Sequence, residues 1–356
     1  MPLRPALGDV SPYRPQKPIR QLQEELGLDR IVKLASNEGA FGPLPAAVAA
    51  FEATAGELNR YPDGGGTMLR EALAERHGVA LEQVVLGNGA DELIRFCAHA
   101  VLDPGERAAF PWPSFPSYVA AVTVANAEAV RVPLLEGLQP DIEALAASGA
   151  KLLYLANPNN PTGQVADFTA LVGDGRLVVL DEAYAEFADP EPDGIGLIRA
   201  GAPNLAVLRT FSKVYGLAAL RIGYAVASPD IADALDRVRP IFNANQPAQE
   251  AALASLHEQH AVGGRIEHVR GAREQIRTAL TDAGLDARPS QANFVYAEVP
   301  GGDGPALARA LLQEGVAIRA LDGFGAPQAV RVTVGTDEEN GAFAQALARV
   351  AGREGG

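Results

Sequence analysis

The chain has 356 residues, of which 47% are hydrophobic and 21% charged, a composition typical of a folded protein long enough for two domains. The formal net charge of −14 argues against nucleic acid or an anionic membrane as a partner, because such surfaces attract clustered Lys and Arg. The single cysteine, Cys97, excludes an internal disulfide and a cysteine-based metal cluster, and we expect no metal. Because the sequence shows no secretory signal and no membrane-length apolar run, we expect a cytoplasmic protein.

The first two-thirds of the chain alternates between strand and helix patterns. Residues 1–35 resemble an arm, with an extended proline-rich start and a short helix at 21–28. Helices are expected at 45–55 and 67–78 and within 83–105, and strands near 83, 106, 127, 151, 176 and 204. The strand patterns are nearly all apolar, as in strands buried on both faces. The pattern predicts an α/β fold with a mostly parallel central sheet and helices on both faces.

The pattern changes after about residue 240. Two helical stretches cover 247–285, strands are expected at 290–299, 315–321 and 329–335, and a helix closes the chain. These elements predict a smaller α+β domain. We expect an N-terminal arm and small-domain segment at 1–39, a large domain at 40–245 and a small C-terminal domain at 246–356.

Lys213 lies in an unusual position for this chain. Only four of the 30 basic residues are lysines, and this one stands between Ser212 and Val214 in an apolar, glycine-containing stretch. A lysine amine can lose its proton and attack a carbonyl carbon, which arginine cannot do. The alternative is a lysine at a helix start whose stem covers apolar surface.

A glycine loop follows the strand predicted near residue 83. Gly87 and Gly89 free the backbone, so the N–H groups at the start of the next helix can bind an anion. Glu92 stands where a dinucleotide-binding loop has its third glycine, which makes that interpretation weak. The alternative is an ordinary helix cap by Asn88 or Asp91.

Polar residues end the neighbouring strands. Asp181 closes an apolar strand, and a carboxylate there needs a partner such as a cationic ring nitrogen, unless it serves as a cap or in an ion pair. Tyr184 brings a hydroxyl to the same edge, and the NPNNPTG turn (157–163) brings amide groups. The alternatives are an exposed tyrosine at the end of a strand and a turn that binds no ligand. Ligands of open α/β sheets bind at this edge. Together these parts fit pyridoxal phosphate, which needs an anion site, a carboxylate and a lysine.

Longer motifs resemble those of one family along nearly the whole chain. They are SPYRP (11–15), KLASNEGAFGP (33–43), NRYPDGG (59–65), LGNGADELI (86–94), NPNNPTG, VVLDEAYAEF (178–187), LRTFSKVYGLAALRIGY (208–224), ANF (292–294) and VRVTVGT (330–336). They resemble the histidinol-phosphate aminotransferase family of fold-type-I pyridoxal-phosphate enzymes. The resemblance implies conversion of L-histidinol phosphate and 2-oxoglutarate to imidazole-acetol phosphate and L-glutamate, a step of histidine biosynthesis, with ping-pong chemistry on a Lys213 aldimine.

The resemblance also implies roles for the cofactor-binding residues. Lys213 would form the aldimine and move the proton, Asp181 would pair with the pyridinium nitrogen, and Tyr184 with Asn160 would bind the phenolic oxygen. Phe115 would stack on the ring. The phosphate would be held by Gly89, Ala90, Asp91, Thr210, Ser212 and Arg221.

Substrate and subunit contacts follow from the same resemblance. The substrate would meet Tyr13, Asn37, Gly39, Asn160, Arg319 and Arg331, with Tyr13 and the two arginines clamping its anionic group. Tyr61 would reach the cofactor phosphate of the neighbouring subunit, which implies a homodimer with shared active sites. The family often has Asn and Pro where this chain has Gly39 and Ala40.

Three other functions remain open from the sequence. An aromatic amino acid aminotransferase would bind a substrate carboxylate at Arg331 instead of a phosphate. A pyridoxal-phosphate-dependent phosphothreonine decarboxylase would share the fold and the cofactor but release carbon dioxide. A non-catalytic binding protein would not depend on Lys213.

Overall fold

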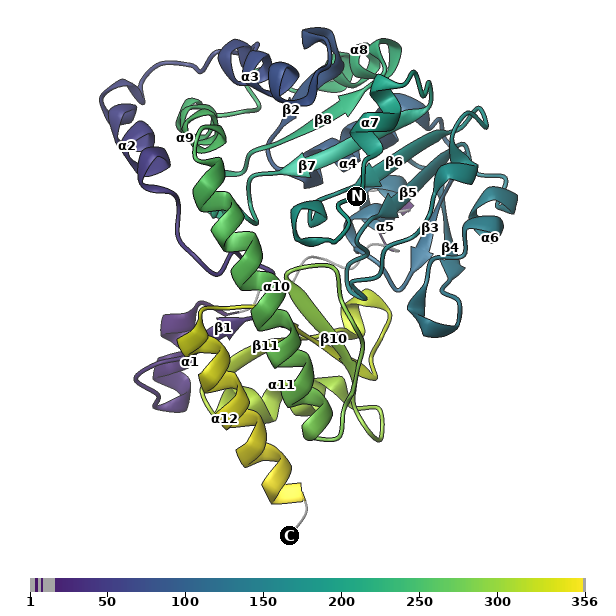
Figure 1. The fold of residues 1–356 in the computed structure, drawn as a ribbon. Coiled ribbons are helices and arrows are strands. Elements are labelled where there is room, and N and C mark those ends of the chain that lie inside the picture. Colours follow the sequence, from purple (N-terminus) through teal and green to yellow (C-terminus); the bar gives the residue numbers. More distant parts are fainter. Residues whose placement is uncertain (1–3, 6–7, 9–16, 355–356) are drawn as a thin grey trace.

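The structure, a computed structural model, describes residues 4–5, 8 and 17–354 (Figure 1). Two β-sheets, of seven and five strands, organise these residues. No helix among them is long and apolar enough to cross a membrane.

The seven-stranded sheet has the order β2-β8-β7-β6-β5-β3-β4. Its strands are β2 (Val84–Gly87), β3 (Arg107–Trp112), β4 (Glu128–Pro133), β5 (Leu152–Ala156), β6 (Leu177–Asp181), β7 (Leu205–Thr210) and β8 (Gly223–Ala227). Only β8 runs antiparallel to its neighbours, β2 and β7. The prediction of a mostly parallel sheet is confirmed, whereas β8 was not anticipated.

Helices cover both faces of this sheet. They are α2 (Pro45–Ala53), α3 (Thr67–His77), α4 (Ala90–Val101), α5 (Ser117–Val124), α6 (Ile142–Ala147), α7 (Gly194–Arg199), α8 (Pro229–Val238) and α9 (Gln246–Leu256). Alternate residues of β6 point into two separate apolar clusters. Val178 and Leu180 belong to the cluster that includes residues of α2, α3 and α9. Leu177 and Val179 belong to the cluster that includes residues of α4, α5 and α8. This division explains the nearly continuous apolar strand sequences.

The five-stranded sheet has the order β1-β11-β12-β10-β9. Its strands are β1 (Val32–Leu34), β9 (Asp286–Ala287), β10 (Phe294–Glu298), β11 (Val316–Ala320) and β12 (Ala329–Thr333), and α1 (Ile19–Leu26), α10 (Gln259–Asp282), α11 (Gly304–Gln313) and α12 (Asp337–Glu354) accompany them. Since β1 pairs in parallel with β11, the segment after α1 joins the sheet of the C-terminal strands.

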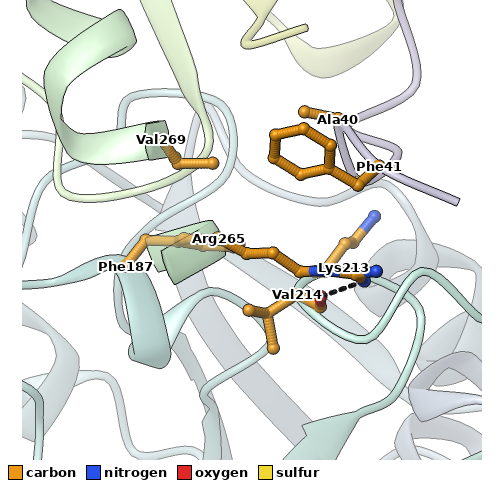
Figure 2. Close-up of a pocket in the computed structure, with 8 residues that line it drawn as sticks. Ala40, Phe41, Phe187, Lys213, Val214, Arg265 and Val269 are labelled. Atoms are coloured by element: carbon orange, nitrogen blue, oxygen red, sulfur yellow. Dashed lines mark hydrogen bonds between the residues drawn. The ribbon is translucent and has the colours of Figure 1, made fainter. Parts of the chain in front are cut away.

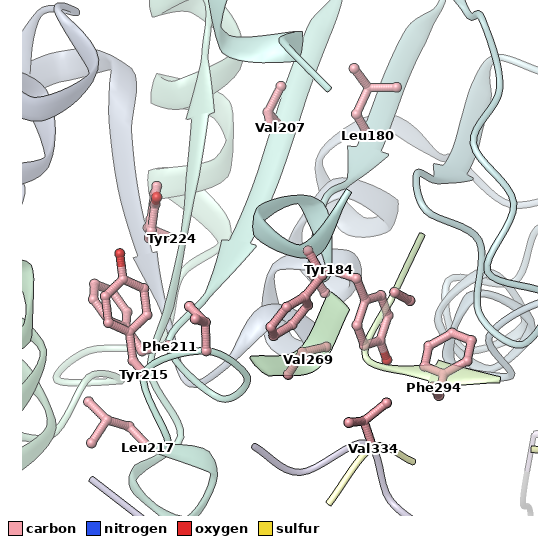
Figure 3. Close-up of a cluster of buried hydrophobic side chains, with 14 of the residues drawn as sticks. Leu180, Tyr184, Val207, Phe211, Tyr215, Leu217, Tyr224, Val269, Phe294 and Val334 are labelled. Atoms are coloured by element: carbon pink, nitrogen blue, oxygen red, sulfur yellow. The ribbon is translucent and has the colours of Figure 1, made fainter. Parts of the chain in front are cut away.

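The two sheets share one continuous core. Figure 3 shows Tyr184, which follows β6, beside Phe294 of β10, with Val269 of α10 nearby. The Tyr184 and Phe294 rings meet edge to face, with centroids 5.1 Å apart. Helix α10 runs from the seven-stranded part to the five-stranded part (Figure 1). The residues that follow β5, β6 and β7 therefore lie where the two sheets approach each other.

Helix α9 falls in the segment expected to open the smaller domain. Its Gln249 nevertheless donates a hydrogen bond of 3.0 Å to the Asp63 carbonyl oxygen, between α2 and α3. The expected boundary after residue 245 stays a prediction.

Candidate active site

Lys213 is a half-buried amine three residues beyond the end of β7. Its Nζ lies 5.4 Å from the centroid of the Tyr184 ring. Burial first, and then the positive charges of Arg331 and Arg221, lower the pKa of Lys213 to about 8, against the opposing effect of Glu38 and Asp181. A useful fraction of the amine is therefore neutral, and nucleophilic, near neutral pH.

Asp181 is a buried carboxylate at the end of β6, only 6% exposed. It accepts hydrogen bonds from the Tyr118 hydroxyl at 2.8 Å and from the Ala183 N–H at 3.2 Å. Burial raises its pKa. Within residues 17–354 it makes no ion pair, so the ion-pair alternative is wrong there, while the bond from the Ala183 N–H agrees with a local cap. A cationic group of a ligand would stabilise this carboxylate.

The N-terminus of α4 is open. Gly89 precedes the helix with φ 77°, and no side chain caps the first turn, so the alternative of an Asn88 or Asp91 cap is wrong. The φ of 77° explains the glycine, because side chains rarely adopt this backbone conformation, and a Cβ there would also displace the Arg221 guanidinium. The Asp91 carboxylate lies 3.3 Å from Arg95 Nε. Asp91 can therefore serve an anion only through its backbone N–H.

Arg221 completes this end of the site. It is exposed, has φ 58°, and makes no ion pair among residues 17–354. Its Nη1 donates to the Ala218 carbonyl oxygen at 3.0 Å and lies 3.5 Å from Ser212 Oγ. Ser212 Oγ in turn accepts a hydrogen bond of 2.9 Å from Thr210. A guanidinium without an ion-pair partner in the described part of the chain, two hydroxyls and the uncapped N–H groups of α4 suit a phosphate.

Two arginines face each other across neighbouring strands. Arg319 of β11 is directly opposite Arg331 of β12, and both donate to the Ala35 carbonyl oxygen at 3.1 Å. The buried Arg331 guanidinium lies between the rings of Phe294 and Phe324, at 5.2 and 5.1 Å from their centroids.

Arg331 lacks a charged partner within the described chain. Its Nη1 donates to Asn160 Oδ1, and its buried Nε has no hydrogen-bond partner. Burial lowers its pKa to about 10. A second anion, bound beside these two arginines, would compensate this buried charge.

Asn37 links the two sheets at the site. It donates to the Tyr184 hydroxyl at 3.0 Å and accepts from Thr333 Oγ1 at 3.1 Å. Gly39, two residues on, lies against the Lys213 backbone, where a Cβ would stand 2.5 Å from the carbonyl oxygen. The predicted substrate residues of this segment therefore lie beside the predicted catalytic ones.

One of the predicted residues stands apart in the described part of the chain. Tyr61 is 82% exposed and stacks on Phe242, with ring centroids 4.6 Å apart, and no described contact joins it to the other predicted residues. Tyr13 lies outside the described residues. Phe115 packs edge to face on Tyr118, at 5.8 Å, and so lies one side chain away from Asp181.

Sequence reasoning missed Tyr118 and Thr333. Tyr118 stands three residues after Phe115, one turn along the start of α5, and this helical spacing could have revealed it. Thr333 ends β12 two residues after Arg331, on the same face of the strand, which is a comparable signal.

The site as a whole combines four chemical features. They are the Lys213 amine with its lowered pKa, the buried Asp181 carboxylate without an ion-pair partner among residues 17–354, the N–H groups of α4 beside Arg221, and the paired arginines of β11 and β12. This set fits a cofactor with a carbonyl carbon, a cationic ring nitrogen and a phosphate, together with an anionic substrate.

Comparisons with known proteins agree with this description. Residues 29–347 match the family model "Aminotransferase class I and II". The chain is 41% identical over 362 residues to histidinol-phosphate aminotransferase 2 of Carboxydothermus hydrogenoformans, covering 98% of this chain and 99% of the relative. It is 42% identical to histidinol-phosphate aminotransferase 2 of Pseudomonas aeruginosa, covering 98% and 97%. The solved structure of histidinol-phosphate aminotransferase from Sinorhizobium meliloti in complex with pyridoxal-5'-phosphate matches with a TM-score of 0.87 and 29% identity, covering 99% and 98%.

Proposed function

Because this chain belongs to the histidinol-phosphate aminotransferase family of class I and II aminotransferases, we propose that it transfers the amino group of L-histidinol phosphate to 2-oxoglutarate. The products would be imidazole-acetol phosphate and L-glutamate, in histidine biosynthesis. The enzyme is a transaminase, and its relatives and its fold agree on that class.

One observation carries the proposal: the reactive amine and the paired arginines share a site. Arg331 is close enough to Lys213 for its charge to contribute to the lowered pKa of the amine. An anionic substrate held by Arg319 and Arg331 would therefore present its reacting group to Lys213. Because a guanidinium pair binds phosphate oxygens well, the phosphate of histidinol phosphate suits this position.

We propose pyridoxal phosphate as the cofactor. When bound, it supplies a carbonyl carbon for an amine and a cationic ring that withdraws electrons. Asp181 would hold the ring nitrogen protonated, and Arg221, Ser212, Thr210 and the α4 N-terminus at Gly89, Ala90 and Asp91 would hold the phosphate. Phe115 would cover one face of the ring.

The remaining site residues would orient the reacting groups. Tyr184 and Asn160 would donate hydrogen bonds to the ring oxygen, and Asn37 fixes the Tyr184 hydroxyl from the other side at 3.0 Å. Lys213, when neutral, would take the proton from the substrate carbon and return it later. Gly39 would border the substrate.

We further propose a homodimer in which Tyr61 reaches the partner's site. An exposed tyrosine stacked on Phe242, with Ile241 85% exposed beside it, is the kind of apolar surface that a second copy of the chain covers. A cytoplasmic location stays a prediction.

A single-turnover absorbance experiment tests the reaction. The protein is loaded with pyridoxal phosphate, and L-histidinol phosphate is added without any oxo acid, with L-phenylalanine in parallel and Lys213→Ala as the control. We expect conversion of the cofactor to its amine form at far lower concentrations of histidinol phosphate than of phenylalanine. Equal or better conversion by phenylalanine would favour an aromatic aminotransferase, and carbon dioxide released from phosphothreonine would favour the lyase.

A further inference from the structure

Two backbone segments around Lys213 pack unusually closely. Gly39 faces the Lys213 carbonyl oxygen, at 2.5 Å from the place its Cβ would occupy. On the other segment, Gly216 has φ 74° and faces the carbonyl oxygens of Gly42 and Phe41. A Cβ on Gly216 would lie 2.8 and 2.9 Å from these two oxygens. We name residues 39–42 and 213–216 together the interlock. It needs glycine at both contact points, because a side chain at either would separate the segments.

Arg265 of α10 ties the two halves of the interlock together. Its Nη1 donates to the Val214 carbonyl oxygen at 3.0 Å and its Nη2 to the Gly42 carbonyl oxygen at 2.7 Å. Its guanidinium also lies 5.9 Å from the centroid of the Phe41 ring. Figure 2 shows this side chain running under Phe41 to the turn that carries Lys213.

Arg265 has no acidic partner among residues 17–354. Desolvation lowers its pKa, so its half-buried charge is held only by neutral carbonyl oxygens and an aromatic ring. A cation in such a place does not strengthen the protein as an ion pair would. Arginine suits this position because its planar guanidinium has two separate nitrogens that can donate to two carbonyl oxygens at once.

The interlock connects Lys213 to the substrate side of the site. The segment that leads into it begins at Ala35, whose carbonyl oxygen accepts from Arg319 and Arg331, and continues through Asn37, which binds Tyr184. It then reaches Gly39 and the Lys213 backbone. One stretch of chain therefore touches the arginine pair at one end and the reactive lysine at the other.

We propose that Arg265 is a positioning residue that holds the interlock closed and thereby fixes the Lys213 amine in its partly dehydrated place. The inference rests on the proposed role of Lys213. It assigns no contact with substrate or cofactor to Arg265. With the tether removed, the 39–42 loop separates from the 213–216 turn, water reaches Lys213, and its amine loses both its orientation and its lowered proton affinity.

The test follows the capture of pyridoxal phosphate by the cofactor-free protein across pH, by absorbance. Capture joins Lys213 Nζ to the aldehyde carbon and releases water, so its rate reports the neutral amine without any substrate. For Arg265→Lys and Arg265→Met we expect the pH midpoint to rise by about half a unit or more, towards that of an ordinary lysine, which alone slows capture at neutral pH about threefold. The lost orientation of the amine should bring the slowing to about tenfold.

The two variants separate a tether from a charge. Lysine keeps the charge but carries all its donors on one nitrogen of a shorter side chain, so it holds the two carbonyl oxygens less well, and a tether predicts that both variants are impaired, Arg265→Met the more. A wild-type profile for Arg265→Lys, or for both variants, would overturn the proposal. Gly39→Ala opens the same contact with Arg265 intact and should reproduce the shift. Arg277→Met is the matched control on α10, because that side chain pairs only with Glu274, at 2.7 Å, and it should leave the profile unchanged.

The outcome also separates this inference from the proposed function. If the wild-type protein captures pyridoxal phosphate and the Arg265 variants capture it with the same pH profile, the interlock has no positioning role while the aminotransferase assignment stands. If the wild-type protein captures none, the role of Lys213 falls, and the inference falls with it.

Discussion

Lys213 differs from the other three lysines of the chain in its surroundings. Lys17, Lys33 and Lys151 each form an ion pair with a glutamate, at 2.5 to 2.9 Å. Lys213 has no such partner among residues 17–354 and instead lies near two arginines and an aromatic ring. The burial and the positive charges around Lys213 favour the neutral form of its amine. Lys213 is therefore distinguished from the other lysines by what surrounds it.

The first prediction concerns the pH dependence of Lys213. Because its pKa is lowered to about 8, the neutral amine is the minor form below that pH and the major form above it. The rate of pyridoxal phosphate capture should rise about tenfold per pH unit below 8 and level off above it. Stopped-flow absorbance measures this rate. A profile that levels off only near pH 10 would contradict the assigned environment.

The second prediction concerns Asp181. Asp181→Asn keeps the shape and the bond from the Tyr118 hydroxyl but removes the charge that would face a cationic ring nitrogen. Affinity for pyridoxal phosphate should fall about 10- to 100-fold, since a hydrogen bond to a charged group contributes about 1.5–3 kcal/mol. Equilibrium dialysis gives the affinity, with Asp233→Asn as the carboxylate control, because Asp233 is exposed on α8 and pairs with Arg237 at 2.7 Å. An equal effect in both variants would remove Asp181 from its assigned role.

At the scale of elements, a buried ion pair joins the ends of β6 and β7. Glu182, next to Asp181, lies 2.6 Å from the Arg209 guanidinium, and Glu191 approaches the same guanidinium at 2.7 Å. Glu182 also accepts from the Gly194 N–H at 3.2 Å, which brings in the start of α7. The strands that carry Asp181 and lead to Lys213 are thus held together at the edge of the site.

The third prediction measures this pair. Glu182→Gln should lower the free energy of unfolding by about 3 kcal/mol, the lower end of the range for breaking a buried pair, because Glu191 still neutralises Arg209. The matched control is Glu106→Gln, which breaks an exposed pair with Lys151 and should cost less than about 1 kcal/mol. Denaturant titration measures both. Equal losses would show that the buried pair adds nothing special.

The sequence predicted elements and site residues where the signal is local. Apolar strands ending in Asp181 or leading to Lys213 combine burial and chemistry within a few residues, so the sheet and the core of the site were accessible. The short strand β8 could not be predicted in this way, because its pairing with β2 depends on a partner distant in the chain and it runs antiparallel to both β2 and β7. The same holds for the contact between Gly39 and the Lys213 carbonyl oxygen, which only the folded chain creates.

At the scale of the whole molecule, the fourth prediction tests shared active sites. Lys213→Ala and Tyr61→Ala subunits should each be impaired alone. If Tyr61 serves the partner's site, a mixed dimer regains one complete site, and random pairing should restore about a quarter of the wild-type activity. The activity of subunits mixed after reversible dissociation measures this. No recovery, with mixed dimers present, would place Tyr61 outside the partner's site.

The central claim is that Lys213 alone bonds to the cofactor, and the most direct measurement identifies that lysine. The protein loaded with pyridoxal phosphate is reduced with sodium borohydride and digested, and its peptides are analysed by mass spectrometry. We predict a phosphopyridoxyl group on the peptide that contains Lys213 and none on those with Lys33 or Lys151, which are paired with carboxylates. A label on another lysine, or no label at all, would contradict the account.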